Sequence, residues 1–184
     1  MMANISVEAY DGAGLRVYWD NTSCCNTYVQ ENYIYFEGNH AFFRALLMQL
    51  IYFAGNDFNL PTGSHVHYDE SLGHRYLGPE LVIEVIPDEE SAMDLDTSEP
   101  LIIHVDVPSN LNKLFESWNA KAEVIVTYDL GIYLLANRQG LMFIATALLF
   151  LLENNNAQIF IPSKDECLDG WRGQGLAFSL IDNV

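Results

Sequence analysis

The side chains best suited to chemistry lie in residues 64–70, where two histidines and a carboxylate alternate along the chain. Successive side chains of a strand point to opposite faces, so an extended chain here would put His65, His67 and Asp69 on one face. Two imidazoles and a carboxylate are ligands for zinc or another divalent cation. The pattern therefore allows a metal-binding protein or a metal-dependent enzyme. The candidates for further ligands are Glu70, His74 and His104.

The simpler interpretation of this strand is a polar sheet face with hydrogen-bonded histidines. We favour it because the second half of the sequence repeats the pattern of the first, as described below, and its strand corresponding to this one, residues 157–161, retains none of the ligands. The glycine-rich stretch 170–175 precedes a strand and opens no helix, which indicates a hairpin turn and not a phosphate-binding loop. Cys24, Cys25 and Cys167 match no disulfide or zinc pattern, and no nucleophile motif is present. The sequence therefore predicts no enzyme and no cofactor.

The net charge narrows the choice of partner. The 184 residues include 25 Asp and Glu against 8 Lys and Arg, a formal charge of -17. Such a surface repels nucleic acid and anionic membranes, whereas it attracts a basic protein, a basic peptide or a metal cation. The alternative interpretation is that the acidic residues serve only to keep the protein soluble and attract no partner. A hydrophobic content of 50% excludes a disordered polyanion, so the charge must lie on a folded body.

Location in the cytoplasm is expected from the N-terminal residues and from the hydropathy pattern. Residues 1–8 have neither a basic segment nor an apolar core, so they do not form a secretory signal. The longest apolar run, residues 141–152, is too short to span a bilayer and is typical of a buried helix.

Tyrosines are concentrated in or beside the expected strands, and tyrosine is a favoured anchor at protein interfaces. Alternation places Tyr33 and Tyr35 on the same strand face as the carboxylate of Glu37, which makes them candidates for a docking surface. Further candidates come from the acidic stretch between the two halves. The predicted partner-binding residues are Tyr33, Tyr35, Glu37, Asp88, Glu89, Glu90, Asp94 and Asp96.

The first half predicts strands around one long helix. Residues 5–10 and 15–20 flank a glycine-containing turn, which is a hairpin signal, and residues 28–36 are rich in strand formers. Apolar residues at three- and four-residue spacing then predict a helix from about Asn39, its N-cap, to residue 54. Strands at 64–69 and 81–86 complete this half.

The second half repeats this order, since residues 132–137 match 34–39 and are again followed by an apolar helix. We therefore expect an α+β fold of two diverged β-β-α-β-β copies, with antiparallel sheets, separate or merged, and one main helix per copy on one face. A short helix within 109–118 lies between strands at 101–107 and 122–129. The expected boundaries are a first copy at 1–87, an acidic linker or loop at 88–100 and a second copy at 101–184.

A family resemblance rests on Glu37-Gly38-Asn39 leading into an apolar helix, followed by residues 60–69 (LPTGSHVHYD) and an apolar strand. Over residues 33–86 this pattern resembles immunity proteins of bacterial polymorphic toxin systems. The resemblance implies a small α+β protein that binds a cognate toxin and needs no active site. It assigns no contact residues, and the second half lacks the histidine stretch.

These observations together predict an immunity protein that neutralises a basic toxin, such as a nuclease, through an acidic, tyrosine-bearing surface. The alternatives are the metal-binding protein described above and a module that forms a homodimer through its sheet edges.

Overall fold

A computed structural model describes residues 2–12, 15–56, 60–61, 63–72, 75–86, 100–154, 158–162 and 168–181. The described part is an α+β structure with two long helices, and both of them begin where the sequence predicts. The helices are α1 (His40–Asn56), α2 (Leu111–Glu116) and α3 (Arg138–Glu153), with a short 3-10 turn at Glu70–Leu72. Within the described residues, none of the helices combines the length and the apolar character needed to cross a membrane.

An asparagine caps each long helix. The Oδ1 of Asn39 accepts a hydrogen bond from the backbone N–H of Phe42 at 3.0 Å, and the Oδ1 of Asn137 accepts one from Gly140 at 3.0 Å. These bonds satisfy N–H groups of the first turn that have no partner within the helix. The N-cap predicted at Asn39 is confirmed.

The strands form two five-stranded sheets and a two-stranded ribbon in the described part of the chain. The first sheet has the order β10-β12-β3-β2-β5, the second has the order β11-β8-β9-β6-β4, and the ribbon joins β1 to β7. The strands are β1 (Met2–Val7), β2 (Cys25–Gln30), β3 (Tyr33–Gly38), β4 (His65–Tyr68), β5 (Tyr76–Leu77), β6 (Leu81–Val85), β7 (Leu101–Asp106), β8 (Val124–Tyr128), β9 (Ile132–Ala136), β10 (Gln158–Ile161), β11 (Trp171–Gly173) and β12 (Gly175–Leu180).

Both sheets are mixed, so the prediction of antiparallel sheets is wrong. Each contains antiparallel pairs, such as β2 with β3 and β8 with β9. However, the strands from the two halves meet in parallel, β12 beside β3 in the first sheet and β6 beside β9 in the second. Short turns in the sequence indicate pairing between strands that follow each other along the chain, and such pairs are antiparallel. The parallel pairs join strands that are distant in the chain, so no turn signal indicates them.

Two predicted hairpins are also wrong. Residues 15–20 form no strand, and β1 pairs instead with β7, about one hundred residues away along the chain. In the stretch 170–175, β11 and β12 do not pair with each other. Strand β11 pairs with β8 in the second sheet, whereas β12 lies between β10 and β3 in the first. The positive φ of 89° at Gly173 occurs where the chain leaves one sheet for the other.

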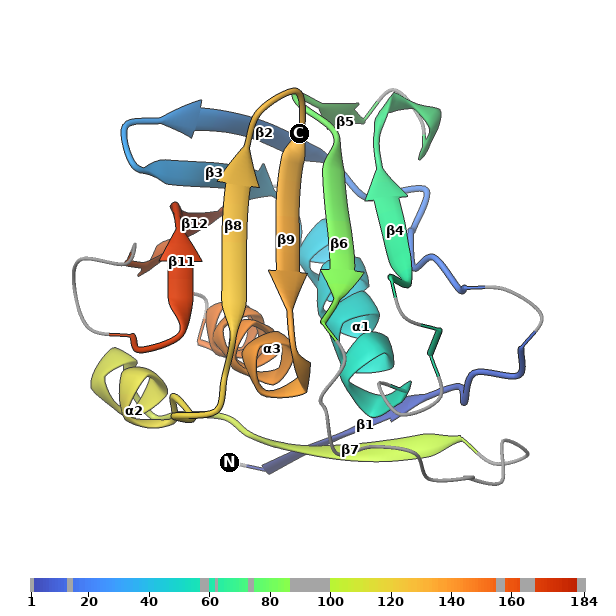
Figure 1. The fold of residues 1–184 in the computed structure, drawn as a ribbon, viewed down its shortest axis with the longest axis vertical. Coiled ribbons are helices and arrows are strands. Elements are labelled where there is room, and N and C mark those ends of the chain that lie inside the picture. Colours follow the sequence, from blue (N-terminus) through green and yellow to red (C-terminus); the bar gives the residue numbers. More distant parts are fainter. Residues whose placement is uncertain are drawn as a thin grey trace.

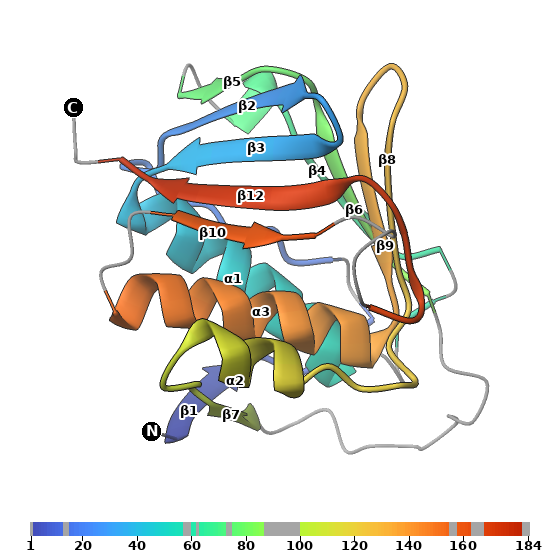
Figure 2. The same cartoon turned by 90° about the vertical axis from the view of Figure 1, so that its left-hand side faces the viewer.

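The two sheets stand at a steep angle to each other, and α1 and α3 lie in the angle between them (Figures 1 and 2). The ribbon of β1 and β7 covers the side of the helices remote from the first sheet, and α2 lies along α3 (Figure 2). The core fills the space between helices and sheets. Phe36 and Phe178, on adjacent strands of the first sheet, are both buried, and the ring of Phe178 also packs on Phe43 of α1.

The two halves contribute to both sheets in a matching way. In chain order, β2, β3, α1, β4, β5 and β6 have the same sequence of element types as β8, β9, α3, β10, β11 and β12. If each element of one half is replaced by its counterpart, the strand order of the first sheet becomes that of the second. Each half therefore has strands in both sheets.

Candidate functional site

Four aromatic rings gather on the side of the first sheet that faces away from the helices. Ile34 and Phe36 of β3 point into the core, so the alternate residues Tyr33, Tyr35 and Glu37 point outward. Tyr28 lies directly opposite Tyr35 on β2, and their rings stack with centroids 4.9 Å apart and planes 2° apart. Together with Phe160 of β10, we call these residues the aromatic face: Tyr28, Tyr33, Tyr35, Glu37 and Phe160.

Small residues on β12 allow rings from two other strands to meet. Strand β12 lies between β3 and β10, yet Phe160 contacts Tyr33 and Tyr35 edge-on, with centroid distances of 5.6 Å and 6.2 Å. Between them lie Ala177 and Gly175, and a Cβ on Gly175 would come within 2.6 Å of the Tyr33 ring. The rings therefore cover β12 and form a continuous surface from β2 to β10.

The aromatic face remains accessible to solvent. Phe160 is 44% exposed, and the three tyrosines and Glu37 are partly exposed. The hydroxyl of Tyr28 donates a 2.8 Å hydrogen bond to Oε1 of Glu37. That bond is the main reason why the pKa of Tyr28 is raised, since the phenol proton would be lost from it on ionisation. At neutral pH Tyr28 therefore keeps its proton and donates a hydrogen bond to Glu37, and this hydrogen bond fixes the position of the Glu37 side chain.

This arrangement has features that suit the binding of basic side chains. Ring faces attract the guanidinium of Arg and the ammonium of Lys, and a carboxylate at the edge of the rings adds a hydrogen-bond acceptor for the same cations. Packed rings also lose little conformational freedom when a partner covers them, because their neighbours already hold them in place. The aromatic face could therefore bind basic side chains of another protein.

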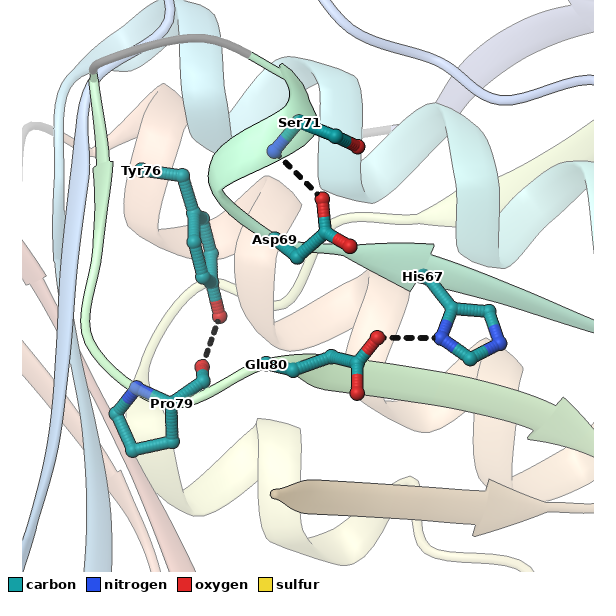
Figure 3. A network of polar contacts seen from close by, with 6 residues as sticks. All are labelled: His67, Asp69, Ser71, Tyr76, Pro79 and Glu80. Carbon is teal, nitrogen blue, oxygen red and sulfur yellow. Dashed lines mark hydrogen bonds and ion pairs between the residues drawn. The ribbon is translucent and has the colours of Figure 1, made fainter. Parts of the chain in front are cut away.

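The predicted histidine pair lies on the other sheet. His65 and His67 are exposed on the same outward face of β4, with ring centroids 5.0 Å apart, so the predicted alternation is confirmed. The Nδ1 of His67 lies 2.6 Å from Oε1 of Glu80 (Figure 3). The Nδ1 of His65 lies 2.8 Å from the carbonyl oxygen of Gly63. Both rings thus use one nitrogen in local hydrogen bonds.

Asp69 lies beyond the end of the strand and serves the 3-10 turn that follows. Its carboxylate accepts a 2.7 Å hydrogen bond from the backbone N–H of Ser71 (Figure 3). Hydrogen bonding to the side chain of Ser71, and after it to this backbone N–H, lowers the pKa of Asp69. His104 lies on β7, where its ring is bonded to Asn4. Across the described residues, no three His, Cys, Asp or Glu side chains come together in a way that could hold a metal ion.

The other predicted partner-binding residues, Asp88, Glu89, Glu90, Asp94 and Asp96, lie outside the described residues, as does His74. Tyr28 and Phe160, by contrast, were not predicted. Alternation along β2 and β10 could have placed each of them on an outward face, but only the strand order brings them beside Tyr33 and Tyr35. The small residues Gly175 and Ala177, at alternate positions of one strand, are the sequence signal for rings that fold over it.

Comparison with known proteins adds no relative, because the chain matches no protein-family model, no curated protein and no solved structure.

Proposed function

We propose that the protein is a binding protein of the immunity type, which captures a basic toxin through the aromatic face and so neutralises it. The observation that carries this proposal is the set of four mutually packed, partly exposed rings around Glu37 on one sheet. Clusters of Tyr and Phe with a fixed acceptor are typical of the energetically dominant centre of a protein interface. Cytoplasmic location would fit this role.

The net charge of -17 supports a basic partner. Long-range attraction speeds the encounter of oppositely charged proteins, whereas the rate of dissociation depends mainly on the buried centre of the interface. In this proposal the distributed acidic residues steer the toxin, and the rings hold it. A nuclease fits as the toxin, since an active site that attracts phosphate is itself basic.

The experiment is co-expression with the toxin candidate encoded by the neighbouring gene, followed by pull-down at low and at physiological salt. The wild-type protein should protect the cells and retain the toxin. Replacing Tyr33 and Tyr35 together by Ala should weaken binding by about 30-fold or more, the loss typical of two or more kcal/mol at an interface centre.

A matched control is Tyr133→Ala. Tyr133 is a partly exposed tyrosine at the corresponding position of β9, on the outward face of the second sheet, so it reports the cost of losing a tyrosine elsewhere. Equal losses in both variants, or protection that survives without Tyr33 and Tyr35, would remove the proposal. Light scattering of the protein alone tests the homodimer separately, because a monomer at high concentration argues against it.

We also infer that the two halves are diverged copies of one unit joined by the acidic stretch 88–100. Their identical order of elements supports this inference, and so do recurring hydrogen bonds around the two helix caps. The backbone N–H of Asn39 donates to Cys24 at 3.0 Å, and that of Asn137 donates to Glu123 at 3.0 Å. Duplication would give one scaffold two outward sheet faces that are free to diverge.

A further inference from the structure

An open groove of about 930 Å³ lies beside the first turns of α1, on a different part of the molecule from the aromatic face. Its walls come from the segment before β2, from α1 and from the residue that precedes β5. The lining residues that matter below are Trp19, Asp20, His40, Arg44, Ala45 and Arg75. This volume is within the usual range of sites for small organic ligands, roughly 300–1,000 Å³.

The groove holds two of the few cationic side chains of an acidic protein. Arg44 and Arg75 are both exposed there, and neither forms an ion pair with another described residue. Asp20 is the one carboxylate among the described residues that line the groove, and it accepts hydrogen bonds from the backbone N–H and the hydroxyl of Thr22 at 2.7 Å and 2.5 Å. Its Oδ1 is therefore occupied in a local turn, whereas both guanidinium groups are available.

The second half provides an internal comparison, because a cavity lies at the corresponding place beside α3. That cavity is smaller, about 260 Å³. Counting from the capping asparagines, Ala45 corresponds to Phe143 and Arg44 to Met142. The Phe143 ring packs edge-on against Trp118, with centroids 4.9 Å apart. In the second half the phenyl ring of Phe143 thus fills a space that the methyl group of Ala45 leaves open in the first half.

The tryptophans of the two halves correspond as well. Trp19 precedes Asp20, whose carbonyl accepts a 2.8 Å hydrogen bond from Ser23, and Trp118 precedes Asn119, whose carbonyl accepts one from the residue three positions later at 2.8 Å. In the first half the indole packs on other rings, including that of Tyr76 at 6.5 Å. A phenyl ring of α1, that of the fully buried Phe42, also packs edge-on against Trp19, with centroids 6.2 Å apart. The groove is therefore open because α1 has only the methyl group of Ala45 at the position where α3 has the ring of Phe143.

We propose that the groove binds a small organic anion, whose phosphate or carboxylate group is held by Arg44 and Arg75 and whose body lies against Trp19. Guanidinium groups recognise both kinds of oxyanion through paired N–H donors. The half-buried His40 on the same wall offers a further donor. This site is independent of the aromatic face and of the toxin-binding function proposed above.

The test is isothermal titration calorimetry of the 184-residue chain with AMP, which carries phosphate on a planar body, and with citrate, which carries carboxylates only. At least one should bind with a dissociation constant of about 1 mM or below. Arg44→Met, which introduces the residue of the other half, should weaken binding at least about tenfold, the usual loss for a charge-assisted contact. Ala45→Phe should abolish binding by filling the groove.

Arg172→Ala is the matched control, since Arg172 is an exposed arginine on β11 and does not line the groove. It should leave binding unchanged. AMP binding alone identifies a phosphate ligand and citrate binding alone a carboxylate ligand. The proposal is overturned if neither probe binds up to about 10 mM, or if Arg44→Met binds as tightly as the wild type. Because Arg44 is exposed, this variant decides the outcome even if Ala45→Phe fails to fold.

Discussion

Removing the side-chain amide of Asn39 should destabilise the whole fold. Its Oδ1 accepts hydrogen bonds from the backbone N–H groups of Phe42 at 3.0 Å and Cys24 at 3.1 Å, and its Nδ2 donates to the carbonyl of Thr22 at 2.7 Å. The residue is buried, so Ala would leave these three backbone groups without their partner. At about 1 kcal/mol for each bond, Asn39→Ala should lower the free energy of unfolding by about 3 kcal/mol.

The same loss is expected on the other half. Asn137 is also buried, and its Oδ1 accepts from Gly140 and Glu123, each at 3.0 Å, while its Nδ2 donates to Lys121 at 2.8 Å. The bonding pattern equals that of Asn39 atom for atom. Asn137→Ala should therefore cost about 3 kcal/mol too, because the same three kinds of backbone group lose their partner.

Urea unfolding followed by circular dichroism measures both changes, with Asn110→Ala as the control. Asn110 caps the short helix α2, but it is exposed, and among the described residues its side chain accepts a hydrogen bond only from Lys113, at 3.0 Å. That variant should cost about 1 kcal/mol or less. If Asn39→Ala and Asn137→Ala differed by more than about 2 kcal/mol, or cost no more than the control, the equivalence of the two caps would be refuted.

Three further outcomes are expected from the buried polar groups and the glycines. Gln49→Leu removes the oxygen that accepts hydrogen bonds from the backbone N–H of Tyr18 and from the Tyr68 hydroxyl. It also removes the buried Gln49 Nε2, which has no hydrogen-bond partner among the described residues. Because the loss and the gain partly cancel, urea unfolding should show a net cost of only about 1 kcal/mol. Burial raises the pKa of Tyr68 and Tyr76, so the contribution of these two tyrosines to stability should be constant below about pH 10 and fall above it, as the unfolded chain ionises first. A urea titration at several alkaline pH values should show this fall, and a weaker one in Tyr68→Phe. Gly173→Ala should lower the melting temperature far more than Gly12→Ala, since both have positive φ but only at Gly173 would a Cβ collide with a backbone carbonyl.

The local parts of this fold could be predicted from the sequence, and the long-range pairings could not. Both long helices follow from apolar residues at three- and four-residue spacing and from an asparagine just before the first turn, which are properties of neighbouring residues. Strand β1 pairs with β7, and β12 pairs with β3. No property of a single strand indicates which distant strand will pair with it. Turn signals suggested hairpins at both places because sequence neighbours are the usual partners.

The candidate site was predictable to the same extent. Alternation along β3 correctly placed Tyr33, Tyr35 and Glu37 on one face, since the period of two belongs to the strand itself. Phe160 joins them only because β10 is the neighbour of β12, which is a matter of sheet order. The groove beside Arg44 has no sequence signature, because it arises where Ala45 carries a methyl group in place of a large side chain.

The differences between the two halves are informative because both halves place their strands and helix in the same arrangement. Residues that face the core have to pack in both halves, whereas outward residues have no such restriction and can diverge. At corresponding outward positions, Tyr35 of the first sheet matches Tyr133 of the second, but Phe160 matches His67. The rings that complete the aromatic face are thus found on one sheet only, even though both backbones could carry them. Neither helix capping nor core packing requires that asymmetry, whereas the binding role proposed for the aromatic face would require it.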